Sequence, residues 1–110
     1  MSKSFRVLDA ARTVADEVNR LLKDPHLSLI HQTQLRDSAQ SVCANIRDGM
    51  GRAVGPDRRK SYRVARGEAE ETDEHLRSNF ADGRIREVAY WRLHNRLILV
   101  IKMLDALSTG

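Results

Sequence analysis

The residues best suited to bind a charged ligand form a basic cluster in the middle of the chain. Its seven members are Arg47, Arg52, Arg58, Arg59, Lys60, Arg63 and Arg66. An acidic segment follows directly and contains Glu68, Glu70, Glu71, Asp73 and Glu74. On a helix this order is unfavourable, because a helix N-terminus carries about half a positive charge and repels cations in its first turns.

Two interpretations of this charge order stay open, and they do not exclude each other. In the first, guanidinium groups bind RNA phosphates through paired hydrogen bonds. In the second, the basic cluster of one subunit pairs with the acidic segment of another. Arginine supplies fifteen of the 19 basic residues, a bias that suits RNA but that genome composition also produces.

Candidate catalytic and metal-binding residues are few. The single cysteine, Cys43, lies in an apolar segment without a neighbouring histidine to lower its pKa, so we expect a small core residue. A di-iron site in a helical bundle needs Glu-x-x-His pairs, and neither His75 nor His94 has a glutamate three positions earlier. The spacing of Glu71 and His75 is typical of a salt-bridged pair on a helix. We therefore predict no catalytic residues, no cofactor and no metal.

Hydrophobic periodicity predicts four helices that would position these side chains. Apolar residues recur every three or four positions over about 5–23, 28–50, 56–82 and 85–107. The predicted breaks are Asp24-Pro25, Gly49-Met50-Gly51, Gly55-Pro56 and Asp82-Gly83. Short connections favour antiparallel neighbours, so we predict an all-α, up-down-up-down four-helix bundle that forms one domain over residues 1–110.

The last predicted helix is apolar nearly all round. One stripe contains Leu93, Leu97, Val100, Leu104 and Leu107. A second stripe contains Trp91, Ile98 and Ile101, and is widened by Leu99 and Met103. Such a helix must be covered on both sides, which predicts self-association. The alternative, a buried strand over residues 97–101, lacks a partner strand.

Length and composition limit the class of protein. The chain has 110 residues, a net charge of +4, 41% hydrophobic and 31% charged residues, as in a folded globular domain. It contains neither an apolar run near the roughly 20 residues of a membrane span nor an apolar signal-peptide core at its N-terminus. We expect a cytoplasmic protein without membrane contact.

Residues 41–52, Ser-Val-Cys-Ala-Asn-Ile-Arg-Asp-Gly-Met-Gly-Arg, resemble the signature Ser-Ile-x-x-Asn-Ile-Ala-Glu-Gly-x-Gly-Arg. That signature is typical of bacterial four-helix-bundle proteins encoded in intervening sequences of 23S ribosomal RNA genes, to which the accessory protein of diversity-generating retroelements is similar. Residues 65–67 and Glu71 resemble the family's Ala-x-Gly-Ser and glutamate pattern. The positions that correspond to the family's structural motif are Ser41, Asn45, Asp48, Gly49, Gly51, Gly67 and Glu71. The chain differs at Arg47, Asp48 and Glu68, where the family has alanine, glutamate and serine.

The resemblance implies a homo-oligomer, typically a pentameric ring, with a basic surface for nucleic acid and no enzymatic activity. We expect Asn45 to be buried and to bond a neighbouring helix. Gly67 costs roughly 1 kcal/mol relative to alanine inside a helix, so we expect it to mark a close helix approach. Tyr90 and Trp91, if exposed, are candidates for stacking on RNA bases.

These observations leave two candidate functions. The first is an RNA-binding or ribonucleoprotein accessory protein that uses the basic cluster. The alternative is a protein-interaction ring that recognises an acidic partner such as a nucleic-acid-processing protein, with the basic cluster used for subunit assembly.

Overall fold

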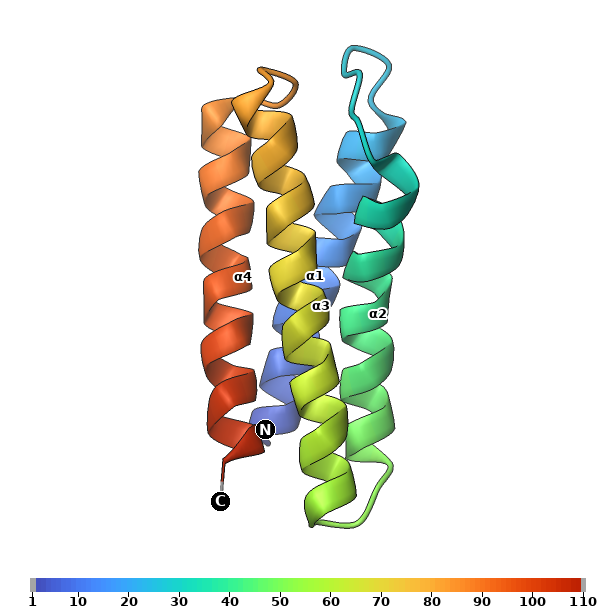
Figure 1. Cartoon of the computed structure of the whole chain (residues 1–110), viewed down its shortest axis with the longest axis vertical. Coiled ribbons are helices and arrows are strands. Elements are labelled where there is room, and N and C mark those ends of the chain that lie inside the picture. The colour runs from blue at the N-terminus through green and yellow to red at the C-terminus, as the bar shows by residue number, and fades with distance from the viewer. Residues whose placement is uncertain (1, 110) are drawn as a thin grey trace.

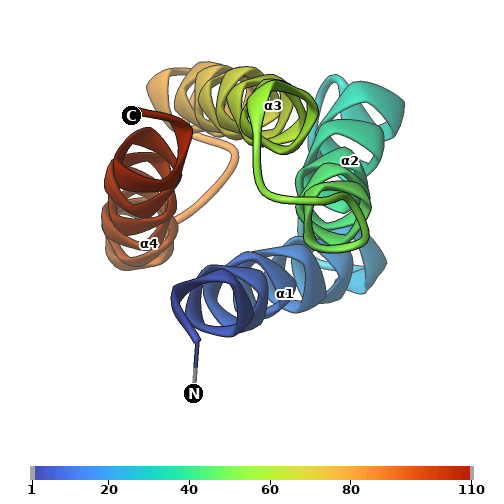
Figure 2. The ribbon, with the colours of Figure 1, turned by 90° about the horizontal axis from the view of Figure 1, so that it is seen from below.

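Four helices run antiparallel along the molecule in the computed structural model, which describes residues 2–109 (Figure 1). They are α1 (Lys3–Lys23), α2 (Gln32–Met50), α3 (Pro56–Ala81) and α4 (Glu87–Ser108). Seen along the bundle axis, they surround one core, and α1 and α4 close the ring (Figure 2). The prediction of an all-α four-helix bundle is confirmed, and residues 97–101 are helical rather than a strand.

The helix ends follow the expected signals in most places. Ser2 caps α1, because its Oγ accepts a hydrogen bond from the Phe5 amide at 3.2 Å. Pro56 occupies the first turn of α3, where its missing amide hydrogen has no cost. Gly83 follows α3 with a φ of 71°, a left-handed conformation that favours glycine.

Two helices begin later than the sequence predicts. The helix predicted from residue 28 begins at Gln32, because Asn79 of α3 holds the preceding chain in a non-helical path. The side chain of Asn79 accepts a hydrogen bond from the Ile30 amide at 2.8 Å and donates one to the Ile30 carbonyl at 3.1 Å. The helix predicted from residue 85 begins at Glu87, and Ile85 instead packs into the core from the connection.

The core is built from the apolar stripes that periodicity identified. On α4 the buried residues are Leu93, Leu97, Val100 and Leu104, spaced three or four apart, together with Tyr90. Glu17 is also buried, and it ties α1 to α4 by accepting hydrogen bonds from Arg92 Nε at 2.7 Å and Arg96 Nη1 at 3.3 Å. These contacts join a buried carboxylate on α1 to two half-exposed arginines on α4 and so fix how the two helices align.

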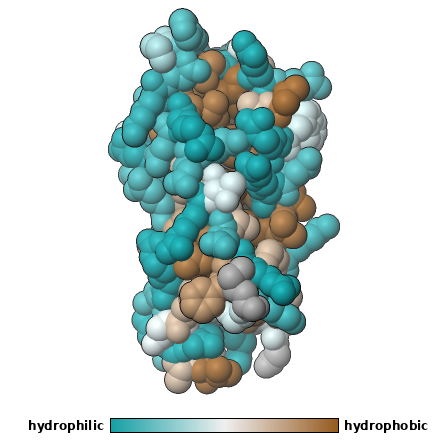
Figure 3. All heavy atoms as spheres, turned by 180° about the vertical axis from the view of Figure 1, so that it is seen from behind, coloured by the Kyte–Doolittle hydropathy of each residue, from teal (hydrophilic) through white to brown (hydrophobic). Residues whose placement is uncertain are grey.

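Apolar side chains also lie outside the core. Val88, Trp91 and Leu99 are spaced along one outward side of α4 and are 73%, 46% and 53% exposed; we call this side the outer α4 face. Ile98, Ile101 and Met103 are half-buried beside the core. The face of the molecule on the side opposite to the view of Figure 1 is largely hydrophilic, with separate hydrophobic patches (Figure 3). No helix within residues 2–109 has the length and hydrophobicity to cross a membrane.

Candidate nucleic-acid interface

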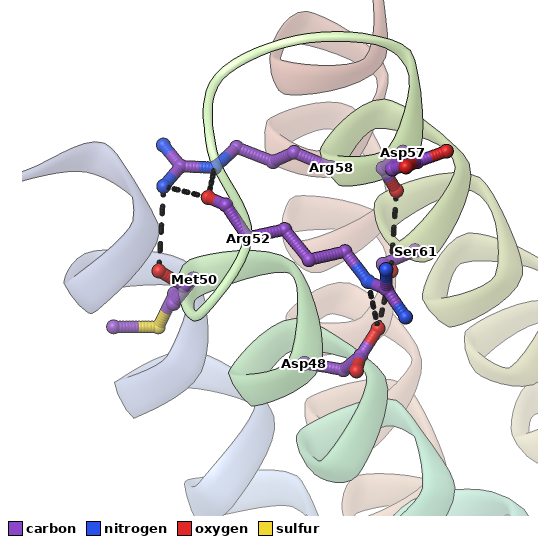
Figure 4. Close-up of polar contacts among 6 residues, drawn as sticks. All are labelled: Asp48, Met50, Arg52, Asp57, Arg58 and Ser61. Carbon is purple, nitrogen blue, oxygen red and sulfur yellow. Dashed lines mark hydrogen bonds and ion pairs between the residues drawn. The ribbon is translucent and has the colours of Figure 1, made fainter.

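Polar contacts hold the turn between α2 and α3 in one conformation (Figure 4). Asp48 Oδ2 accepts hydrogen bonds from Arg52 Nε at 2.9 Å and from Ser61 Oγ at 2.5 Å. Across the turn, Arg58 Nε donates to the Arg52 carbonyl at 2.9 Å, and Arg58 Nη2 reaches the Met50 carbonyl at 3.3 Å. Two arginines predicted to bind phosphate therefore have a structural task, which is to fix the start of α3.

The charge state of Asp48 follows from the same contacts. The hydrogen bond from Arg52 lowers the pKa of this carboxyl below its usual value, and the hydrogen bond from Ser61 lowers it further. In turn, the hydrogen bond with Asp48 raises the pKa of Arg52. Both groups therefore stay charged at neutral pH, and the pair persists on an otherwise exposed surface.

Gly49 and Gly51 belong to the end of α2 that leads into this turn. A Cβ atom on Gly49 would lie 2.5 Å from Cε1 of Tyr62, so this glycine lets a buried ring on α3 pack directly on the backbone of α2. The Tyr62 hydroxyl then lies 2.8 Å from Ser4 Oγ on α1. Gly51 closes the helix with its amide hydrogen-bonded to the Arg47 carbonyl at 3.1 Å.

Two predicted roles within the signature are wrong. Asn45 is half-buried rather than buried, and its Nδ2 donates to the Ser41 carbonyl at 3.0 Å and to Ser41 Oγ at 3.1 Å, both within α2. Gly67 is exposed, and a Cβ atom there would meet nothing within 4 Å, so it marks no close helix approach. Asn45 instead lines a polar surface groove of about 280 Å³ between α2 and α3, beside Lys60 and Ser61.

The rest of the basic cluster divides between paired and unpaired cations. Arg66 forms ion pairs with Glu70 on its own helix and with Asp105 on α4. Arg58 has no carboxylate within 4.0 Å in the described part of the chain but bonds the carbonyls of the turn. Four members of the cluster have neither an ion pair nor a side-chain hydrogen bond among residues 2–109. These four are Arg47, Arg59, Lys60 and Arg63. Arg59, Lys60 and Arg63 lie on the first turns of α3, whereas Arg47 lines a groove against α1.

Three of the five residues of the acidic segment have basic partners inside the chain. Glu70 pairs with Arg66, and Asp73 Oδ2 accepts from Arg77 Nη2 at 3.0 Å. Asp73 Oδ1 also lies 2.8 Å from His94 Nδ1 on α4. The predicted pair of Glu71 and His75 is confirmed at 3.5 Å.

Glu68, where the resembled family has serine, lies half-buried in the same segment. Burial raises the pKa of this carboxyl, and the neighbouring Glu71 raises it further.

The aromatic residues do not join the basic cluster. Tyr90 is only 3% exposed and stacks on Phe80 with ring centres 4.6 Å apart, so the expectation of an exposed ring is wrong for Tyr90. Trp91 is exposed, but it lies near the start of α4, at the end of the bundle opposite the α2–α3 turn (Figure 1). A base stacked on Trp91 would therefore be remote from phosphates bound by the cluster.

The chemistry of Cys43 agrees with a structural role. The thiol is buried in the core, and burial raises its pKa. Among the described residues, no three histidine, cysteine, aspartate or glutamate side chains are arranged to hold a metal ion. The candidate interface is therefore built from the unpaired cations of the basic cluster near the α2–α3 turn.

Comparison with known proteins gives matches to a family and to a solved structure. The family model described as 23S rRNA-intervening sequence protein matches residues 3–106. The crystal structure of a protein of unknown function from the S23 ribosomal protein family of Bacteroides thetaiotaomicron is similar, with a TM-score of 0.88 and 23% sequence identity. The alignment covers 98% of this chain and 100% of that one. No curated protein matches the chain.

Proposed function

The chain belongs to the 23S rRNA-intervening sequence protein family, and from this premise we propose that it is a non-enzymatic RNA-binding protein. The binding surface is the end of the bundle that carries the α2–α3 turn. Phosphates there contact the unpaired cations of the basic cluster.

The observation that carries this proposal is the excess of positive charge at the start of α3, where the first turn contains one acidic residue, Asp57. Arg59, Lys60 and Arg63 have no carboxylate within 4.0 Å among residues 2–109, although they lie beside the positive end of a helix. A phosphate relieves this repulsion and gains charge-assisted hydrogen bonds. The contacts of Arg52 and Arg58 hold the turn, so the cations are presented from a fixed backbone.

The alternative, in which the basic cluster pairs with the acidic segment of another subunit, has less support. Glu70, Glu71 and Asp73 each already have a basic partner within the chain, which leaves Glu68 and Glu74 as the members of the acidic segment without an ion pair among residues 2–109. Self-association itself is favoured by a different feature, the outer α4 face. We therefore propose a homo-oligomer, a pentameric ring as in the resembled family, that buries this face and leaves the α2–α3 turn accessible to RNA.

The test compares two triple variants with the same change in charge. The first is Arg59→Ala, Lys60→Ala, Arg63→Ala; the control is Arg20→Ala, Lys23→Ala, Arg86→Ala at the opposite end. Binding of an unstructured RNA is measured by fluorescence anisotropy over a range of salt concentrations. Losing three phosphate contacts should weaken binding and flatten the slope of log affinity against log salt by about 2, since each contact on a single strand contributes about 0.7.

Oligomer mass measured on the same variants separates the two functions. If the first variant keeps its mass and loses RNA, the proposal holds. If the unmodified protein binds no RNA and the first variant has a lower mass, the cluster is an assembly device and the proposal is wrong.

A further inference from the structure

A groove on the opposite side of α2 from the α2–α3 surface groove contains another set of unpaired polar side chains. It lies between α1 and α2 and has a volume of about 430 Å³. Arg12 and Asn19 line it from α1, and Arg47 and Gln40 line it from α2. Because the two helices are antiparallel, the arginines share one end of the groove and the amides share the other. On each helix the arginine and the amide residue are seven positions apart, which corresponds to about 10 Å along the helix axis.

The two arginines repel each other without local compensation. No carboxylate among residues 2–109 lies within 4.0 Å of Arg12 or Arg47. The groove contains one acidic residue, Asp16, one turn from Arg12 but outside ion-pair distance. Burial raises the pKa of the Cys43 thiol, and the positive charges of Arg47 and Arg12 partly oppose that rise. Two cations thus converge on one stretch of the groove, where an anion would be stabilised.

The middle and the far end of the groove differ from the cationic end. Small side chains of Ala15, Cys43 and Ala44 form the middle, which leaves room for a flat group above them. At the far end, the amides of Asn19 and Gln40 have no hydrogen-bond partner within the described residues. An amide offers both donors and an acceptor, as recognition of a base edge requires.

We propose that this groove is a nucleotide-binding subsite for single-stranded RNA. A phosphate lies between Arg12 and Arg47, the ribose and base lie over the small residues, and Asn19 and Gln40 contact the base edge. The order of cation pair, apolar floor and amide pair matches the order of phosphate, sugar and base in one nucleotide. The inference rests on the proposed function, because the strand that enters the groove continues from the phosphates held at the α2–α3 turn.

The first experiment separates phosphate contacts from base contacts. RNA dodecamers of uridine, adenosine and cytidine are titrated against the full chain by fluorescence anisotropy. Arg12→Gln with Arg47→Gln should weaken all three roughly tenfold at low salt and flatten the salt slope by about 1.4. Asn19→Ala with Gln40→Ala should leave the slope unchanged and reduce the preference among the three sequences. The matched control is Arg6→Gln with Arg20→Gln, two exposed positions of α1 that do not line the groove.

A second experiment locates the bound strand with a thiol at the groove surface, because Cys43 itself is buried. In Ala44→Cys, an exposed position that lines the groove, a saturating RNA dodecamer should slow alkylation of the introduced thiol several-fold. This protection should be absent when Arg12→Gln and Arg47→Gln are added to Ala44→Cys. Equal binding and equal protection by the deoxyribose dodecamer would overturn the assignment to RNA.

The outcomes distinguish this subsite from the proposed function. If RNA binding depends on Arg59, Lys60 and Arg63 but the Arg12, Arg47 variant behaves as its control, the subsite is wrong and the proposed function stands. If the unmodified protein binds no RNA dodecamer, both are wrong.

Discussion

At the scale of single residues, two glycines of similar sequence context have opposite roles. Gly49 lies where a Cβ atom would overlap the buried ring of Tyr62, whereas Gly67 faces open space. Both lie within helices, where glycine costs roughly 1 kcal/mol relative to alanine. The packing environment, and not helix propensity, therefore decides the effect of adding a methyl group.

We predict that Gly49→Ala destabilises the protein and that Gly67→Ala stabilises it. Displacing the Tyr62 ring should cost about 1–3 kcal/mol in the free energy of unfolding, the usual cost of overpacking a core. Gly67→Ala should gain up to about 1 kcal/mol from helix propensity. Denaturant unfolding of both variants measures the difference, and a shift in the same direction for both would show that Tyr62 does not pack on Gly49 as described.

The same residues show what a sequence can reveal about a site. The signature glycines could be identified as special from their spacing, and the pairing of Glu71 with His75 followed from helical periodicity. The tasks of Arg52 and Arg58 could not be predicted, because they depend on where the carbonyls of the turn point. For Asn45 the closest hydroxyl belongs to its own helix, which no pattern of residue types distinguishes from a bond across helices.

At the scale of the elements, apolar periodicity was sufficient to predict the four helices. The exception is the connection before α2, which is set by a contact 49 residues away in the chain. Asn79 is fully buried, and its amide satisfies both backbone groups of Ile30 as well as the His75 carbonyl at 2.8 Å. The late start of α2 therefore has a tertiary cause.

Asn79→Ala should lower the free energy of unfolding by about 1–3 kcal/mol, because it leaves buried backbone groups of Ile30 without partners. The exposed Gln34 on α2 provides the control, Gln34→Ala. Hydrogen exchange of the Ile30 amide should accelerate in the Asn79 variant alone. Equal losses of stability in the two variants would mean that Asn79 does not anchor the connection.

At the scale of the whole molecule, ion pairs across helices decide which surface charges are free to bind a ligand. Arg66 is neutralised by Asp105, a residue from the other end of the sequence, and the buried Glu17 is neutralised from α4. The sequence showed the cluster of basic residues but not this partition, because it depends on which helices become neighbours. Together with the local pair of Arg52 and the carbonyl contacts of Arg58, this ion pair of Arg66 reduces seven candidate phosphate ligands to four.

The exposed apolar side chains of α4 lead to a prediction about the assembled molecule. Light scattering of the purified protein should give a mass several times the 12.5 kDa of one chain, since Val88, Trp91 and Leu99 otherwise stay in water. Leu99→Glu should reduce this mass, because an unpaired charge buried at a subunit contact costs several kcal/mol. Leu99 is half-exposed in the single chain, so this variant should keep its helical content, whereas a charge at the half-buried Ile101 would also strain the core.

Gln34→Glu, an exposed position on α2 with the same change in charge, is the matched control and should leave the mass unchanged. Circular dichroism of each variant shows whether a lower mass comes from dissociation or from unfolding. A single-chain mass for the unmodified protein at micromolar concentration would show that the outer α4 face is not a subunit contact. A mass that falls in the Leu99 variant while RNA affinity per chain is retained would place assembly and RNA binding on separate surfaces.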